Sequence, residues 1–297
     1  MIAAPKTAKS GFLDVGALRV HHMHGGHGTP VVFIHGLGSS GYMEWRRNLD
    51  PTAVRHRVYA PDLPGYGRTE KPRVRYTIGY FTRFIERYME NRGLRSAAII
   101  GASLGGRIAL ELALEKPHLA RRLVLVNALG LGRPRPQMAQ MAYGLVTVPR
   151  VGEAVMRFTR SALRWAPPRT IRRVAGRFAN SSTDLEKVID DTYLQNLREM
   201  YETDGFHNAY LSTVRSLVHP RALFGGEHDV SARLGELKLP VQIIWGADDP
   251  LFPISHATRA HAAIPDCRLT IIEGAGHTPQ AERPDEFNRA LLSFLDS

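Results

Sequence analysis

The sequence predicts an α/β protein with a mostly parallel sheet and a helical insertion. Apolar, β-branched runs alternate with stretches of helical periodicity, which is the pattern of βαβ units. Over residues 130–222 no apolar strand pattern occurs, and helical stretches broken by prolines take its place. Loops with Ser103, with Asp248 and Asp249, and with His277 follow predicted strands. These loops are expected to meet at the carboxyl edge of the sheet.

The composition indicates a globular protein without a nucleic-acid partner. The 297 residues carry a net charge of +11, from 39 Lys and Arg against 28 Asp and Glu. There is, however, no Lys/Arg run, no zinc-ligand spacing and no RNA-binding aromatic motif. We find no signal-peptide pattern and no stretch of membrane-spanning length, and the single Cys267 excludes an internal disulfide. A cytoplasmic protein without stable membrane insertion is therefore expected.

Residues 12–22 predict the first elements, an antiparallel hairpin around a glycine turn. Four histidines lie close together at its end: His21, His22, His24 and His27. Since no cluster of further ligands accompanies them, surface histidines are expected here and no metal site.

The next stretch predicts the centre of the sheet. Val31-Val32-Phe33-Ile34 is apolar on both faces, which is typical of a central parallel strand. The glycine-rich loop His35-Gly36-Leu37-Gly38 follows and lets backbone N–H groups approach a ligand, but it lacks the Gly-Lys-Ser/Thr of a phosphate loop. A helix is then expected around Trp45 to Leu49, a strand over 57–62 and a helix over 77–92.

A tight turn around Ser103 is the strongest functional signal. An apolar run ends at Ile100, Gly101-Ala102-Ser103-Leu104-Gly105 breaks it, and a helical pattern follows. Such a turn holds the serine hydroxyl above the sheet in a strained backbone conformation, and glycines are needed where side chains would collide. The N-terminus of the following helix directs unpaired N–H groups at the same point. We therefore predict that Ser103 is a nucleophile that attacks a carbonyl group.

The remaining elements follow from the same periodicities. The sequence predicts strands over 122–127, 241–245 and 269–272, helices over 138–148, 151–165 and 185–201, and a closing helix over 287–295.

The predicted loops supply the groups that acyl transfer requires. The imidazole of His277 would take the proton of the serine and return it to the leaving group. A carboxylate, Asp248 or Asp249, would fix the tautomer of that imidazole. The backbone N–H groups of Leu37 and Leu104 are the expected oxyanion donors. Because these groups complete the reaction with water, no metal or organic cofactor is expected.

Several motifs resemble those of α/β-hydrolases with a helical cap, and the resemblance extends over nearly the whole chain. They are His35-Gly36-Leu37-Gly38, Asp62-Leu63-Pro64-Gly65-Tyr66-Gly67, Gly101-Ala102-Ser103-Leu104-Gly105-Gly106, Trp245-Gly246-Ala247-Asp248-Asp249 and Gly276-His277. The resemblance implies a mostly parallel eight-stranded sheet with helices on both faces, formed by residues 1–130 and 223–297, and a cap over 131–222. It also implies Asp249 rather than Asp248 as the acid, because the family places the acid three residues after the glycine of Trp-Gly.

The resemblance narrows the activity to a few alternatives. Ser103 differs from the aspartate nucleophile of epoxide hydrolases and haloalkane dehalogenases. C–C hydrolases of ring-opened diketones typically have Asn before the serine and Trp after the histidine, whereas this chain has Ala102 and Thr278. We therefore expect hydrolysis of a small carboxylic ester through an acyl-enzyme, with C–C hydrolysis as the alternative. A non-catalytic, ligand-binding member is a second alternative.

The predicted cap has an uneven charge distribution. Between Leu131 and Arg177 there are ten arginines and one acid, Glu153, with apolar residues between them. Amphipathic helices with a basic outer side are expected. The apolar faces would form an acyl-accepting pocket, and the arginines either stay solvated or face an anionic surface.

Overall fold

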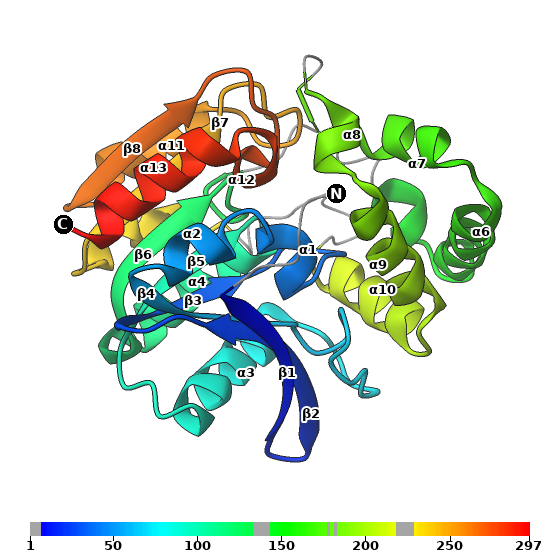
Figure 1. The fold of residues 1–297 in the computed structure, drawn as a ribbon, viewed down its shortest axis with the longest axis horizontal. Helices are drawn as coiled ribbons and strands as arrows, with labels where there is room; N and C mark the ends of the chain where they lie inside the picture. The colour runs from blue at the N-terminus through cyan, green and yellow to red at the C-terminus, as the bar shows by residue number, and fades with distance from the viewer. Residues whose placement is uncertain (1–6, 133–142, 177–178, 181–182, 218–228) are drawn as a thin grey trace.

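A computed structural model of the protein describes residues 7–132, 143–176, 179–180, 183–217 and 229–297. Its strands are β1 Ala8–Val15, β2 Leu18–Gly25, β3 Thr29–Ile34, β4 His56–Pro61, β5 Ala97–Ala102, β6 Ala120–Val126, β7 Val241–Gly246 and β8 Cys267–Ile272. They form one eight-stranded sheet in the order β1-β2-β4-β3-β5-β6-β7-β8 (Figure 1). The pairs β1–β2 and β2–β4 are antiparallel, and all others are parallel. The predicted fold class is thus confirmed.

Helices cover both faces of this sheet (Figure 1). They are α1 Gly41–Trp45, α2 Leu49–Ala53, α3 Ile78–Asn91, α4 Leu104–Glu115, α11 Ser255–Ala263, α12 Pro279–Glu282 and α13 Pro284–Leu295, with short 3₁₀ helices at Pro117–Leu119 and Ser231–Glu236. Alternate strand residues point to opposite faces. Val32 and Ile34 of β3 therefore join the core under α3 and α4, whereas Val31 and Phe33 join the core under α2 and α13.

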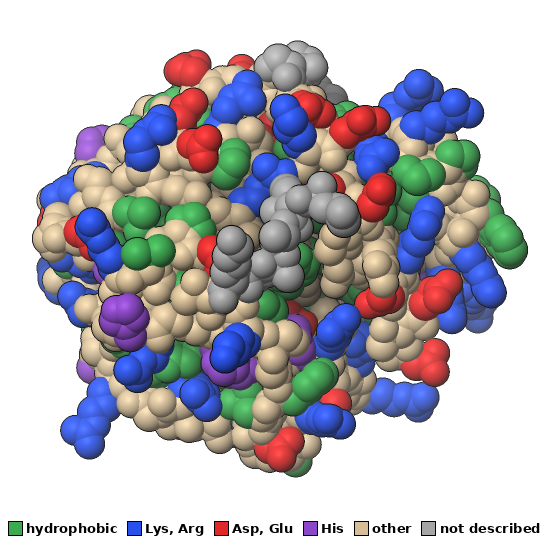
Figure 2. All heavy atoms as spheres, in the orientation of Figure 1, with side chains coloured by type: hydrophobic (Ala, Val, Ile, Leu, Met, Phe, Trp, Pro, Cys, Tyr) green, Lys and Arg blue, Asp and Glu red, His purple; other side chains and the backbone are tan. Residues whose placement is uncertain are grey.

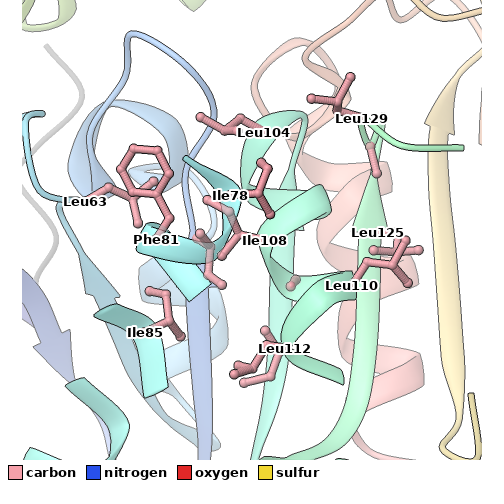
Figure 3. Close-up of a cluster of buried hydrophobic side chains, with 14 of the residues drawn as sticks. Leu63, Ile78, Phe81, Ile85, Leu104, Ile108, Leu110, Leu112, Leu125 and Leu129 are labelled. Atoms are coloured by element: carbon pink, nitrogen blue, oxygen red, sulfur yellow. The ribbon is translucent and has the colours of Figure 1, made fainter. Parts of the chain in front are cut away.

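The α3–α4 side of the core lies directly beneath the serine turn. Figure 3 shows Phe81 and Ile85 of α3 beside Ile108 and Leu112 of α4, with Leu104 at the upper end of α4. These side chains recur at helical spacing and are almost fully buried. Their packing fixes α4, and with it the first residue after Ser103.

The helix expected around Trp45 to Leu49 is wrong. Residues 46–48 form a turn between α1 and α2. The buried Asn48 side chain donates hydrogen bonds to the Gln280 carbonyl oxygen at 3.2 Å and to Asn288 Oδ1 at 2.9 Å. These partners are distant in sequence, so the apolar periodicity of residues 45–49 could not reveal the turn.

The expectation of surface histidines is wrong for His21 and His22, which are buried. His21 Nδ1 lies 2.8 Å from Asp62 Oδ2, and His22 Nδ1 lies 2.6 Å from the Tyr88 hydroxyl. Burial and the nearby His24 lower the pKa of His22 to about 3. Both histidines thus belong to the polar core.

In the described part of the segment between β6 and β7, all regular elements are helices. We call α6 Val151–Trp165, α7 Pro168–Ala175, α8 Leu185–Val188, α9 Asp191–Glu202 and α10 Phe206–Leu217 the inserted helices. They lie together to one side of the sheet, at the right in Figure 1. Leu163, Ile171, Ile189 and Leu194 form a small core of their own.

The inserted helices match the sequence predictions only in part. The helix over 151–165 is confirmed, and residues 143–147 of the helix expected over 138–148 are helical, while its first residues lie outside the described part. The single helix expected over 185–201 is wrong, because Asp190 accepts a hydrogen bond from the Tyr193 N–H at 2.8 Å and begins a new helix there. The boundaries at 131 and 222 stay a prediction. Among the described residues no helix is long and apolar enough to cross a membrane.

Candidate active site

Ser103 lies between β5 and α4 in a strained turn. Its φ of 51° and ψ of −115° are rare for a residue with a side chain. A Cβ atom on Gly101 would overlap the carbonyl oxygen of Gly105, and one on Gly105 would overlap that of Ile34. Only glycines allow α4 to approach β5 and β3 so closely, so the predicted strand–turn–helix geometry is confirmed.

His277 and Asp249 are hydrogen-bonded to each other. His277 Nδ1 lies 2.9 Å from Asp249 Oδ2, so the ring carries its proton on Nδ1 and leaves Nε2 as the acceptor. Asp249 is buried, and its Oδ1 also accepts from the N–H groups of Leu251 at 2.7 Å and Phe252 at 3.1 Å. Asp248, in contrast, is exposed and accepts a hydrogen bond from Asn180 Nδ2 at 2.6 Å.

The pKa values of His277 and Asp249 are both shifted from their usual ranges. Burial by itself lowers the pKa of His277, but the Asp249 carboxylate outweighs it and raises that pKa above the usual range. Burial by itself raises the pKa of Asp249, but His277 and Asn127 outweigh it and lower that pKa. Asp249 therefore stays ionised, and a proton taken up by His277 is stabilised.

Asn127 is a residue of this site that the sequence analysis missed. It follows β6, is fully buried and has a φ of 40°. Its Nδ2 donates to Asp249 Oδ2 at 2.6 Å, and its Oδ1 accepts from the Gly246 N–H at 3.1 Å. A polar residue directly after an apolar strand, at the edge that also carries Ser103, was the available signal.

The predicted oxyanion donors lie beside the serine. Leu37, Ser103 and Leu104 together border a small cavity of about 20 Å³. Leu104 is the first residue of α4, so its N–H has no partner within the helix. Neither the Leu37 N–H nor the Leu104 N–H bonds to another described residue. The two groups are thus available to an oxygen bound next to Ser103.

The buried His35 supports this loop. Its Nδ1 donates to the Gly36 carbonyl oxygen at 2.8 Å, and its Nε2 accepts from the Leu63 N–H at 2.9 Å. Burial lowers the pKa of His35, which favours this neutral form with one donor and one acceptor nitrogen. The ring therefore fixes the backbone just before Leu37.

A larger cavity of about 710 Å³ opens above Ser103 and His277, a size typical of small-molecule sites. About half of its lining residues are apolar residues of the inserted helices and of the segments next to them. Both Ser103 and His277 line it, with no direct hydrogen bond between them in the described structure. Catalytic hydrogen bonds often tighten only when substrate binds.

Two further charged side chains line this cavity, Glu44 and Arg46. Glu44 Oε1 accepts from Gln280 Nε2 at 2.6 Å. The buried Arg46 donates to the Val188 carbonyl oxygen at 2.6 Å and to Asp190 Oδ2 at 3.3 Å. Arg46 thus joins the core to the inserted helices.

A buried carboxylate, Glu282, holds the loop that carries His277. Its Oε2 accepts from the Gly276 N–H at 3.0 Å, and its Oε1 from the Thr278 N–H at 3.0 Å. The same carboxylate accepts from the Asn180 N–H at 2.8 Å and from Thr183 Oγ1 at 2.7 Å. The backbone on both sides of His277 is therefore tied to the inserted segment, a connection that the sequence analysis did not find.

Within the described part of the chain, no three His, Cys, Asp or Glu side chains lie together as metal ligands would.

The sheet order and the strained serine turn define a hydrolase fold. Residues 29–284 match the family model of the alpha/beta hydrolase fold. The chain therefore belongs to the α/β-hydrolase family, as the motifs predicted.

Curated relatives and solved structures align over most of the chain. An uncharacterized protein of Mycobacterium tuberculosis is 31% identical over 92% of this chain and 76% of its own length. The 2-hydroxy-6-oxo-6-phenylhexa-2,4-dienoate hydrolase of Comamonas testosteroni is 28% identical over 98% of this chain and 96% of its own. The structure of a meta-cleavage product hydrolase from Pseudomonas fluorescens superposes with a TM-score of 0.74, at 25% identity and over 98% of both chains.

Proposed function

We propose that this protein is a serine hydrolase that cleaves carboxylic esters. Ser103 is the nucleophile, His277 the general base and acid, and Asp249 the carboxylate that orients His277. The observation that carries the proposal is the 2.9 Å hydrogen bond between His277 Nδ1 and Asp249 Oδ2, on the wall of the cavity that Ser103 also lines.

The reaction follows from these positions. Ser103 Oγ attacks the ester carbonyl while His277 Nε2 takes its proton, and the oxyanion accepts hydrogen bonds from the N–H groups of Leu37 and Leu104. The tetrahedral intermediate collapses, His277 protonates the leaving alcohol, and the acyl group stays on Ser103. Water, deprotonated by His277, then attacks the acyl-enzyme, and His277 returns the proton to Ser103 Oγ as the acid is released.

Two features support ester cleavage over C–C cleavage. Ala102 and Thr278 flank the nucleophile and the base, where C–C hydrolases are expected to have Asn and Trp. The cavity is also mostly apolar, which suits an acyl chain. C–C hydrolysis stays the second candidate, because the Comamonas testosteroni relative is named a dienoate hydrolase and Arg46 offers a buried cation at the cavity wall.

The proposal includes a domain arrangement and a location. Residues 131–222 form a cap over the site, and residues 1–130 and 223–297 form the core. We place the enzyme in the cytoplasm, in agreement with its single cysteine. A non-catalytic role in ligand binding is the outcome that the following experiment separates from both enzymatic candidates.

A fluorophosphonate probe tests the nucleophile, and p-nitrophenyl esters alongside a diketone dienoate test the substrate class. The probe is expected to label the protein but not its Ser103→Ala variant, whereas Ser293→Ala, an exposed serine on α13, keeps the label. Ser103→Ala and His277→Ala are each expected to lower kcat by about 10³ or more. The double variant adds little, because the residues act together. Unchanged turnover in Ser103→Ala would remove the proposal, and turnover of the dienoate alone would favour the C–C hydrolase.

A further inference from the structure

Helix α6 exposes an apolar stripe to solvent. Val151, Ala154, Phe158 and Trp165 are all exposed, and their spacing of three, four and seven residues places them on one side of the helix. Phe158 is 75% exposed and Trp165 is 78% exposed. The apolar residues of α6 thus cover the cavity only in part, and two large aromatic side chains are left in water.

Arginines form a second stripe next to the apolar one. Arg157, Arg160 and Arg164 recur at spacings of three and four and are exposed, and Arg169 and Arg173 of α7 are exposed as well. None of these five pairs with a carboxylate of the described residues. The Arg164 guanidinium lies 5.5 Å from the centre of the Trp165 ring. Figure 2 shows blue and green side chains side by side over the inserted helices.

Within α6 and α7 there is almost no acidic side chain to neutralise these arginines. Glu153 is the one acid between residues 131 and 177. Its carboxylate oxygens are bonded to Arg215 at 2.9 and 3.1 Å. We call Val151, Phe158, Trp165, Val174 and the five arginines the arginine–aromatic face.

This face adjoins the large cavity. Phe158 is at the same time exposed and part of the cavity lining, and so is Val174 of α7, which is 56% exposed. An apolar surface therefore continues from the outside of α6 and α7 into the space above Ser103 and His277. A molecule with an acyl chain could pass along it without exposing that chain to water.

We propose that the arginine–aromatic face docks on the surface of an anionic lipid bilayer. The arginines match the negative charge of lipid phosphates, and a row of exposed aromatic and aliphatic side chains beside them matches the boundary between headgroups and acyl chains. An acidic soluble partner would account for the arginines but not for the exposed Phe158 and Trp165. The proposal deepens the proposed function. Docking itself does not depend on ester hydrolysis. Only its consequence, that the ester substrate enters from the membrane, rests on the proposed function.

Tryptophan fluorescence tests the docking directly. Trp45 and Trp245 are fully buried, so among the three tryptophans Trp165 alone is exposed to lipid or solvent. We expect vesicles of phosphatidylcholine with phosphatidylglycerol to shift its emission to shorter wavelength, and brominated lipids to quench it. Vesicles of phosphatidylcholine alone should have a much smaller effect. A Trp165→Ser variant should lose the vesicle-induced change.

Co-sedimentation with the same vesicles tests the charged stripe. The triple variant Arg157→Gln, Arg160→Gln and Arg164→Gln is expected to bind at least about tenfold more weakly, and Trp165→Ser also more weakly. The matched control replaces three exposed arginines of the core, Arg57, Arg83 and Arg95, by Gln and should bind as the unmodified protein does. Unfolding midpoints verify that every variant is folded.

Several outcomes would overturn the docking proposal. One is that the protein does not bind anionic vesicles at low ionic strength. Another is an equal loss of vesicle affinity in both triple variants, which would show that net charge alone explains the binding. Two further outcomes would indicate an acidic macromolecule as the partner instead. One is binding to vesicles without quenching of Trp165 fluorescence. The other is binding to heparin that competes fully with vesicle binding and does not depend on Trp165. Because the measurements are made on the Ser103→Ala protein as well, they are independent of hydrolysis. A protein that labels with fluorophosphonate but does not bind vesicles would leave the proposed function intact.

Discussion

Asp249 makes more hydrogen bonds than its proposed role, fixing the tautomer of His277, would require. It accepts from His277 and Asn127 on Oδ2, and from the N–H groups of Leu251 and Phe252 on Oδ1. Four donors around one buried carboxylate hold it in its charged form and in one orientation. The orientation of the His277 ring therefore depends on groups from the ends of both β6 and β7.

The pH dependence of activity should reveal this arrangement. As the proposed base, His277 can act only when it is neutral, and its pKa is raised, so kcat/KM should increase with pH through a value above the ordinary 6.5 or so of histidine. Asp249→Asn is expected to lower kcat by roughly 10³–10⁴ and to move this limb to lower pH, because burial then lowers the pKa of His277 against only the weaker opposing effects of Glu44 and Glu282. Asp248→Asn is the control and should change neither. The reverse ranking of the two variants would assign the acid role to Asp248.

At the level of single residues, the sequence predicted the groups that follow strands but not those that support them. The positions of Ser103, Asp249 and His277 followed from motifs and from strand ends. Asn127 and Glu282 act through partners more than a hundred residues away or on a neighbouring loop, and periodicity carries no signal for such hydrogen bonds. His21 was misjudged for the same reason, since its partner Asp62 is distant in sequence.

At the level of elements, the loop between β8 and α12 depends on a carboxylate within α12. Glu282 is buried and accepts hydrogen bonds from both sides of His277 and from the inserted segment. A carboxylate can accept all of these bonds, whereas an amide has one oxygen and would place an NH₂ group against backbone N–H donors.

A conservative substitution tests this loop. Glu282→Gln is expected to lower the free energy of unfolding by about 2–4 kcal/mol, since at least one buried donor loses its acceptor. It should also lower kcat more than it raises KM, because the His277 ring is no longer held in position. Thermal unfolding and steady-state kinetics provide the two readouts. Glu273→Gln, an exposed glutamate that follows β8, is the control; an equal effect there would show that loss of charge alone is responsible.

The elements themselves were predictable where local patterns decide them. The sequence predicted helix α6 and the parallel strands with nearly their observed bounds, whereas the hairpin expected over 12–22 extends over 8–25. The breaks between α1 and α2 and between α8 and α9 were not predicted, because apolar periodicity continues through both. In the first, Asn48 turns toward α12 and α13, and in the second, Asp190 caps the next helix and binds Arg46.

At the level of the whole molecule, the cavity forms between the carboxyl edge of the sheet and the inserted helices. Its floor contains Ser103 and His277, and its walls are largely apolar, with Met156 among them. Methionine side chains adapt to ligands of different shape. We therefore expect the residues of the cavity walls to determine the substrate preference, and the residues of the floor to carry out the reaction.

Esters of graded acyl length test this division. With p-nitrophenyl esters, kcat/KM is expected to increase over several carbons and then to fall once the cavity is full. Each buried CH₂ contributes at most about 0.8 kcal/mol, or roughly fourfold. Met156→Trp, which fills part of the space, should move the maximum to shorter chains. A profile that is flat or declines steadily from acetate onward would contradict an acyl-binding cavity and favour a small or polar substrate.

The overall architecture was predictable because strand and helix patterns alternate regularly, and the insertion was visible as a change of pattern. The sequence did not reveal which sides of the inserted helices face the cavity. Arginines and apolar residues alternate along α6 in a way that fits both a buried and an exposed apolar side, and only the packing of Met156 and Leu163 decides it.

The backbone hydrogen bond from the Val230 N–H to the Gly130 carbonyl oxygen, at 2.9 Å, joins the two ends of the segment that leaves the sheet after β6. Because Ser231–Glu236 then leads the chain to the amino end of β7, the long excursion between Gly130 and Val230 begins and ends at one closed junction. Such a segment can be exchanged between homologues, by evolution or by an engineer, as a single cassette. A graft would need to supply acceptors for Arg46 and donors for Glu282, and the reacting groups would stay with the recipient.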